Sequence, residues 1–163
     1  MTKPGTPLRA MIDRQGRDGC VKWIGLRPAR KADIEPVEMV EITHDGLVGD
    51  HWSRGGSRAV TLIQWEHLPV IGAFLGQDAP SPELLRRNNA IAGINQMSLR
   101  RRSFRIGNVV LRGTGICAPC SRMEQNLGPG GYSAVRHHGG IGAEVITPGR
   151  IRLGDAVTLI AES

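Results

Sequence analysis

Apolar residues along this chain recur in short runs, and most of these runs alternate with polar positions. Alternation over about four to eight residues is typical of a half-buried strand, and a short unbroken apolar run fits a buried one. Such runs cover residues 20–26, 37–43, 58–63, 90–94 and 142–146. Many short strands separated by turns predict a mainly β fold, a closed or nearly closed β-barrel with a few short helices.

Two helices are expected in the middle of the chain. One lies within 65–75, where Pro69 has to occupy the first turn or divide the helix. The other is better marked, because Ser81 can cap it and Pro82 suits the first helical position. We expect this second helix to run to about Arg87.

Two segments in the second half of the chain share one pattern. Residues 104–111 and 151–159 each run strand, turn, strand, with Gly-Asn in one turn and Gly-Asp in the other. Gly at the first turn position suits the two-residue turn of a β-hairpin. Each segment is therefore predicted to fold as a hairpin.

Length and composition indicate one globular domain. The chain has 163 residues, 40% of them apolar, which is enough for a hydrophobic core. Residues 1–18 are mostly polar and contain Gly and Pro, so we expect a flexible N-terminal arm ahead of a single domain over 19–163. Three cysteines and the absence of a signal-peptide pattern predict a cytoplasmic protein with reduced thiols.

The charge balance is basic, with 21 Lys and Arg against 15 Asp and Glu. Basic clusters at 86–87 and 100–102 fit a phosphate-bearing partner, or they are solvated surface charge. Aromatic residues make up only 4%, whereas a protein that stacks single-stranded bases usually has more. No run approaches the roughly 18 apolar residues of a membrane span. We therefore expect neither a nucleic acid nor a membrane as partner.

The motif with the most chemistry is Cys117-Ala-Pro-Cys120. A short helix over 121–126 is expected to follow it. Cys120 would then lie at a helix N-terminus, where free N–H groups and the helix dipole stabilise a thiolate. In this interpretation Cys120 is a metal ligand or a nucleophile, and Cys117 assists it or packs beside it.

Three other interpretations of the motif stay open. A C-x-P-C pair resembles a thioredoxin-type redox motif, although that motif belongs at the first helix of a βαβ unit. A zinc site would recruit His137, His138 and the distant Cys20, but adjacent histidines usually point apart. The two cysteines can also be small buried apolar residues without chemistry.

Three polar clusters elsewhere offer ligand contacts. In 46–51, Asp50 binds a ligand or caps a turn, and His51 is a proton shuttle, a phosphate contact or an exposed side chain. In 86–89, two arginines and two asparagines suit a phosphate and a pterin or purine edge, or simply end a helix. The basic, Gly-rich loop 136–140 is an anion nest or a purely structural loop.

The order of these elements resembles the MOSC domain, the module named for the C-terminus of molybdenum-cofactor sulfurases. The resemblance covers about residues 19–163, and the combination is more specific than any single motif. It rests on Gly46-Leu-x-Gly-Asp50, Arg58-Ala-Val-Thr-Leu-Ile63 with Glu66, Arg86-Arg-Asn88, Gly93-Ile-Asn95, Phe104-Arg-Ile-Gly107, Cys117-x-Pro-Cys120, Gly139-Gly140 and Ile151-Arg-Leu-Gly-Asp155.

The resemblance implies a β-barrel-like fold and binding of a molybdenum cofactor, a molybdopterin phosphate whose dithiolene holds the metal. The family's hallmark cysteine, which ligates molybdenum or is proposed to carry sulfur, falls on Cys120. The segment that contacts the pterin falls on Arg86 and Asn88. The remaining cofactor contacts are assigned by motif, position and charge to Gly46, Gly49, Asp50, His51, Arg58, Arg136, His137, Gly139 and Gly140.

We therefore expect a protein that binds the molybdenum cofactor with Cys120 as the metal ligand. It would act in the reduction of N-hydroxylated compounds, with electrons from a donor protein, or in cofactor handling, so enzymatic activity stays open. One alternative is a non-enzymatic carrier of persulfide sulfur or of the cofactor, with a cysteine desulfurase as partner. The second alternative is a thiol–disulfide protein that uses both cysteines of the pair.

Overall fold

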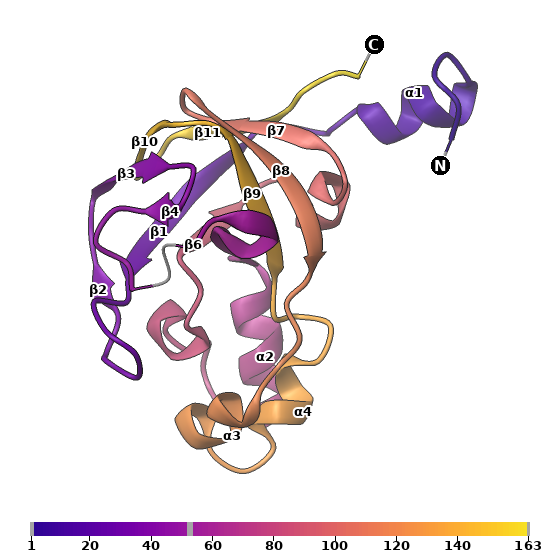
Figure 1. Cartoon of the computed structure of the whole chain (residues 1–163). Helices are drawn as coiled ribbons and strands as arrows, with labels where there is room; N and C mark the ends of the chain where they lie inside the picture. The colour runs from indigo at the N-terminus through magenta and orange to yellow at the C-terminus, as the bar shows by residue number, and fades with distance from the viewer. Residues whose placement is uncertain (1, 52–53, 163) are drawn as a thin grey trace.

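The computed structural model describes residues 2–51 and 54–162, and its chain folds into a barrel of short strands with small helices (Figure 1). The strands are β1 Gly19–Leu26, β2 Glu35–Pro36, β3 Met39–Thr43, β4 Gly46–Leu47, β5 Val60–Gln64, β6 Asn89–Ala92, β7 Ser103–Ile106, β8 Val109–Ile116, β9 Ile141–Thr147, β10 Gly149–Arg152 and β11 Ala156–Leu159. The α-helices are α1 Pro7–Asp13, α2 His67–Leu75, α3 Ser121–Leu127 and α4 Gly131–Val135, and the 3-10 helices are η1 Gly56–Arg58, η2 Pro82–Leu85 and η3 Gln96–Leu99.

The barrel closes through β1. Its first residues, Gly19 and Cys20, pair with Val157 and Ala156 of β11, and the stretch from Cys20 to Ile24 pairs with β6 on the other side. The strand order round the barrel is β11-β7-β8-β9-β5-β6-β1, so seven strands complete the circle. The prediction of a mainly β, closed barrel is confirmed.

One parallel pairing allows this barrel to have an odd number of strands. If every neighbour were antiparallel, strand direction would alternate round the circle and the number would have to be even. Here β5 and β6 run parallel, with Leu62 opposite Asn89. The crossover between them holds α2 and η2, as a parallel connection requires. Pro69 lies in the first turn of α2, where its missing N–H breaks no helical hydrogen bond.

The second predicted helix is shorter than the sequence pattern suggests. The expected end at about Arg87 is wrong, because the segment is a 3-10 helix that ends at Leu85. Arg86 takes a left-handed φ of 56°, which reverses the chain. The reversal turns Arg87 and Asn88 inward, where both are buried and hydrogen-bonded. Long-range hydrogen bonds of buried polar groups therefore decide where this helix stops.

Of the two predicted hairpins, one is confirmed and one is wrong. β7 and β8 pair through the Gly107-Asn108 turn, with Ile106 opposite Val109. β10 and β11 do not pair with each other, because β10 joins a three-stranded sheet with β3 and β4 whereas β11 lies in the barrel. Ile151 and Val157 reach the same core from these two different sheets. Neighbouring residues determine the turn, but the strand with which each strand pairs depends on the whole fold.

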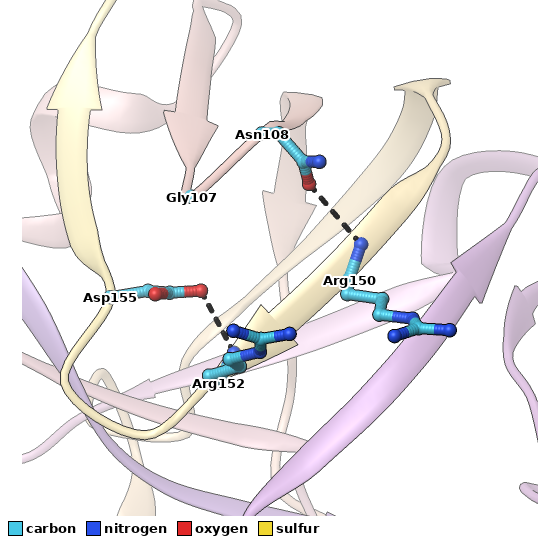
Figure 2. Close-up of a pocket in the computed structure, with 5 residues that line it drawn as sticks. All are labelled: Gly107, Asn108, Arg150, Arg152 and Asp155. Atoms are coloured by element: carbon cyan, nitrogen blue, oxygen red, sulfur yellow. Dashed lines mark hydrogen bonds between the residues drawn. The ribbon is translucent and has the colours of Figure 1, made fainter.

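The two Gly-containing turns meet at the end of the barrel away from α3 (Figures 1 and 2). Asn108 accepts a hydrogen bond from the Arg150 backbone N–H at 3.2 Å, and Asp155 accepts one from the Arg152 backbone N–H at 2.8 Å. With Gly107 these residues line a cavity of about 390 Å³. A Cβ on Gly107 would lie 2.6 Å from the Asp155 carboxylate. Asn108 thus connects its turn to β10, whereas Asp155 closes the turn at the end of β10.

Two hydrophobic clusters divide the interior. The larger one fills the barrel and includes Phe104 and Leu62. The smaller one includes Ile63, Leu68 and Met123, and it joins β5 to α2 and α3. Leu62 and Ile63 are neighbours on β5 and face opposite sides, as the two-residue period of a strand requires. The smaller cluster therefore fixes α3, and with it the residues at its N-terminus, against the barrel.

The first 18 residues contain a helix, α1, which lies near the C-terminus in Figure 1. Thr6 caps it, and Arg9 forms an ion pair with Glu162 at 2.7 Å. Asp13 also pairs with Arg102, at 2.8 Å. The arm thus has more structure than its composition predicts, and its flexibility stays a prediction. In the described part of the chain, no helix has both the length and the apolar character needed to cross a membrane.

Candidate functional site

Cys120 occupies the N-cap position of α3, as the sequence predicts, and it is exposed. Cys117 is buried, with 2% of its surface exposed. The Cys117 backbone N–H donates to the Gly140 carbonyl oxygen at 2.9 Å, which holds the loop before α3 against the loop before β9. Cys117 therefore belongs to the packing of the site, and Cys120 is the accessible thiol.

A cavity of about 310 Å³ opens beside Cys120, and we call it the Cys120 cavity. Four parts of the chain form it: the β1–β2 loop, the residues after β4, the residues between η2 and β6, and the start of α3. Its lining consists of Arg27, Arg30, Lys31, His51, Arg86, Arg87, Cys120, Arg122 and Met123. Six of these nine residues are Arg or Lys, and none is Asp or Glu. A lining of one charge sign favours a ligand of the opposite sign, here an anion.

Arg87 is the most deeply buried cation of this cavity, with only 7% of its surface exposed. Its Nε donates to the Gly139 carbonyl oxygen at 2.7 Å, and its Nη2 donates to the Ala118 carbonyl oxygen at 3.5 Å. Burial lowers the pKa of the Arg87 guanidinium from its ordinary value, and the main opposing influences come from Cys117 and Cys120 rather than from a carboxylate. A buried cation that lacks a carboxylate partner is costly unless an anion binds beside it.

Arg27 and Asp50 form a buried ion pair at the rim of the cavity. Arg27 Nη2 donates to Asp50 Oδ2 at 2.8 Å, and both Nε and the backbone N–H of Arg27 donate to Oδ1. The Asp50 side chain is 1% exposed and does not line the cavity. Asp50 thus acts through Arg27, whose guanidinium it orients.

Asn88, which the resemblance assigns to the pterin contacts, is fully buried next to Arg27. Its Nδ2 donates to the Gly25 carbonyl oxygen, and its Oδ1 accepts from the Thr61 hydroxyl and from Arg27 Nη2. These bonds join β1, β5 and the start of β6. Asn88 therefore helps to hold Arg27 in position. Its amide is already hydrogen-bonded within the protein.

Arg86 and Arg122 hold the β1–β2 loop over the site. Arg86 Nη1 donates to the Ala32 carbonyl oxygen at 2.6 Å, and Arg122 Nη2 donates to the Lys31 carbonyl oxygen at 3.1 Å. Burial is the main cause that lowers the pKa of Arg86, with Arg122 and Arg27 adding to it and Asp33 and Asp50 opposing it. Two guanidinium groups thus brace a loop that itself contributes three cations to the cavity.

Sequence reasoning missed Arg27, Arg30, Lys31 and Arg122. The signal for three of them was the basic run Arg27-Pro-Ala-Arg30-Lys31 directly after the first strand. Arg87 belongs to the 86–89 cluster that suits a phosphate, but it was not assigned to the cofactor site. The structure brings these residues together with Cys120, Arg86 and His51, which the sequence did assign.

Other assigned residues lie outside the cavity lining. Arg136 and His137 are exposed in the loop after α4. Arg58 is exposed too, with its Nη2 3.9 Å from the Cys117 sulfur. Gly139 and Gly140 support the site through their carbonyl groups, which bind Arg87 and the Cys117 N–H.

Gly49 has a more local role at the turn before Asp50. Its φ of 94° is in the left-handed region that favours glycine, and a Cβ there would lie 3.3 Å from Leu26. A side chain there would be strained by the backbone conformation, and Leu26 would have to move slightly to make room.

A zinc site at the cysteine pair finds no support in the part of the chain that the structure describes. Within residues 2–51 and 54–162, no three His, Cys, Asp or Glu side chains come together closely enough to bind a metal ion. His138 instead faces His67, with 3.2 Å between their Nδ1 atoms. A single thiolate ligand, as the molybdenum cofactor would use, needs no such cluster.

A family model described as the MOSC domain matches residues 44–158, which include Cys120 and most of the barrel. The chain belongs to the MOSC domain family. The resemblance found in the sequence is therefore confirmed. No protein among the curated ones matches the chain.

Solved structures show the same fold as this MOSC chain at low sequence identity. The YuaD protein from Bacillus subtilis superimposes with a TM-score of 0.78 at 17% identity, covering 90% of this chain and 98% of that one. YiiM from Escherichia coli gives 0.67 at 18% identity, covering 88% and 71%. YiiM from Geobacillus stearothermophilus gives 0.71 at 16% identity, covering 88% and 75%. At this identity the likeness establishes the barrel and leaves the ligand to be argued from the site.

Proposed function

We propose that the Cys120 cavity binds the molybdenum cofactor, with the Cys120 thiolate as a ligand to the metal. One observation carries the proposal. The accessible cysteine of the C-x-P-C motif opens onto a cavity whose charged lining residues are all cationic. One of them, Arg87, is buried and forms no ion pair with a carboxylate of residues 2–51 or 54–162. Membership of the MOSC family supports the choice of this cofactor over other anions.

The residues present fit such a group. Thiolate sulfur is a soft ligand of the kind that transition metals accept, and Cys120 is the one cysteine in the lining. Arg87, Arg27 and Arg86 present guanidinium groups suited to a phosphate, and their positions are fixed by the carbonyl, carboxylate and amide contacts described above. Asp50 and Asn88 serve as positioning residues for Arg27.

When bound, the molybdenum centre would supply two-electron redox chemistry. That chemistry suits the reduction of an N-hydroxylated compound, in which two electrons and two protons convert N–OH to N–H and water. The electrons would come from a donor protein. The chain's own part would be to bind the anion through the cationic lining and to present the exposed Cys120 sulfur to the metal.

Metal analysis tests the proposal directly. The wild type, Cys120→Ser and Cys20→Ser are made in a host that synthesises the cofactor, and molybdenum and oxidised pterin are measured per protein chain. We expect both in the wild type and in Cys20→Ser, the matched control, and loss of molybdenum in Cys120→Ser. A wild-type protein that holds neither under these conditions would contradict the proposal.

The exposure of Cys120 also supports a second function, a carrier of persulfide sulfur. A persulfide on Cys120 would be an anion in the same cationic surroundings. Incubation with a cysteine desulfurase and cysteine, followed by alkylation and mass spectrometry, should then show one added sulfur on Cys120 in wild type and Cys117→Ala alike. If the added sulfur were found in the wild type but not in Cys117→Ala, thiol–disulfide chemistry between the two cysteines would be indicated instead.

A further inference from the structure

A second cavity, of about 370 Å³, adjoins the Cys120 cavity, and we call it the mixed-charge cavity. It lies between the loop before β2, η2 and α3. Its lining consists of Asp33, Ile34, Pro36, Glu83, Leu84, Arg86, Arg122 and Asn126. Arg86 and Arg122 also line the Cys120 cavity, so the two cavities meet at these guanidinium groups.

The charges of the two cavities differ. The Cys120 cavity has six cations and no carboxylate, whereas the mixed-charge cavity has two cations and two carboxylates, Asp33 and Glu83. Three apolar side chains, Ile34, Pro36 and Leu84, complete its wall. A ligand chosen by the first cavity for negative charge is therefore a poor match for the second.

The two carboxylates and two guanidinium groups of the mixed-charge cavity face the same space. In the part of the chain that the structure describes, no ion pair joins Asp33 or Glu83 to Arg86 or Arg122. Arg86 and Arg122 each donate instead to a backbone carbonyl oxygen, and each guanidinium has further N–H donors to offer. Asp33 acts on Arg86 electrostatically, from beyond ion-pair distance. Opposite charges that surround a cavity unpaired favour a ligand that carries both signs.

The wall of the cavity is held in place on each side. Asn126 Nδ2 donates to the Leu84 carbonyl oxygen at 2.9 Å, which joins α3 to η2. Arg86 and Arg122 tie the loop before β2 to the same two elements. The volume lies in the range of about 300 to 1,000 Å³ that small-molecule sites occupy.

We propose that the mixed-charge cavity is a binding site for a small zwitterion with an apolar body. Its cationic group lies against Asp33 and Glu83, its anionic group lies against Arg86 and Arg122, and its apolar part contacts Ile34, Pro36 and Leu84. Such a molecule would sit directly beside the Cys120 cavity. This site does not depend on the proposed function, because no cofactor takes part in forming it.

An NMR titration of the full, metal-free chain tests the site. The probes are 4-(aminomethyl)benzoate, which has both charges, benzylamine, which has only the cation, and 4-methylbenzoate, which has only the anion. We expect the zwitterion to shift backbone amides of 33–34, 83–86 and 122–126 and to bind about fivefold more tightly than either analogue, since each loses one set of partly exposed charge contacts.

Paired variants assign the charges. Asp33→Asn with Glu83→Gln should weaken the zwitterion and benzylamine about fivefold. It should not weaken 4-methylbenzoate, because the lost carboxylates only repel an anion. Glu35→Gln removes a neighbouring exposed carboxylate that does not line the cavity, and it should change nothing. Equal binding of the zwitterion to the wild type and the double variant would overturn the proposal. Tighter binding of 4-methylbenzoate than of the zwitterion would also overturn it, since the cavity would then be an extension of the anion site. The spectra report whether each variant is folded.

Discussion

The Arg87 guanidinium donates to the Gly139 carbonyl oxygen at 2.7 Å, and this bond connects the residue before Asn88 to the loop that precedes β9. Through the neighbouring Gly140 carbonyl the same loop also holds the Cys117 backbone N–H. One short segment thus contacts both the buried Arg87 guanidinium and the loop that leads to Cys120. In this MOSC protein the position of the buried cation is structurally linked to that loop.

Replacement of Arg87 should reduce both anion affinity and stability. Arg87→Gln removes a buried charge that faces the Cys120 cavity and leaves the Gly139 carbonyl without its donor, which costs about 1–3 kcal/mol for a buried acceptor. We expect pyrophosphate binding to weaken at least about tenfold by calorimetry, given the strength of charge-assisted contacts. Arg136→Gln, a change at an exposed arginine outside the cavity, is the control. Equal pyrophosphate affinity in Arg87→Gln would show that Arg87 does not face the ligand.

Gly140 should tolerate no side chain. Its φ is 93°, and an added Cβ would overlap the Leu62 carbonyl oxygen on β5. Gly140→Ala has to displace backbone, so we expect a loss of several kcal/mol, about 3 or more, in urea unfolding. Gly115→Ala, where a Cβ would meet nothing within 4 Å, should stay close to the wild type. A Gly140→Ala protein of unchanged stability would mean that the loop before β9 does not approach β5 this closely.

The Arg27–Asp50 pair should behave as a coupled unit. Asp50→Ala removes the carboxylate that accepts from the Arg27 guanidinium and from the Arg27 backbone N–H, and loss of one partner of a buried pair costs about 3–5 kcal/mol. Arg27 is 15% exposed and can reach solvent, so we expect a value near the lower end. A double-mutant cycle with Arg27→Gln measures the coupling. Additive effects of the two changes would show that the ion pair contributes nothing beyond packing.

Stability should fall as the pH drops below about 6.5, because of His67. Burial, and next the neighbouring His138, lower the pKa of His67 from 6.5, while Glu66 opposes the shift. A base whose pKa is lower in the folded state binds fewer protons there than when unfolded, so its contribution is full above pH 6.5 and is lost as pH falls.

Urea midpoints at pH 7.5 and 5.5 measure this effect in the wild type and in His67→Gln. The group facing His67 across the ring contact is His138, and Phe74 lies beyond it. We expect a smaller pH dependence in His67→Gln than in the wild type. An equal dependence in both proteins would assign the effect to other groups.

Much of the fold could be predicted from local pattern. Alternation marked the strands, Pro69 and Pro82 marked the starts of α2 and η2, and Gly107-Asn108 marked a real hairpin turn. Each of these depends on residues close together in sequence. The end of η2 at Leu85 could not be predicted in this way, because the buried hydrogen bonds of Arg87 and Asn88 that end it reach to Gly139, Thr61 and Gly25.

By itself the sequence determined the barrel class, the family and the position of Cys120 at the start of a helix, since short-range periodicity, turn residues and motif order decide these. Only the tertiary structure decided that Arg27, Arg87 and Arg122 share a cavity with Cys120, and that Asp50 and Asn88 position Arg27. The physical reason is that burial and hydrogen-bond partners arise when strands distant in sequence pair. A residue's role in this site depends on which groups the barrel brings beside it.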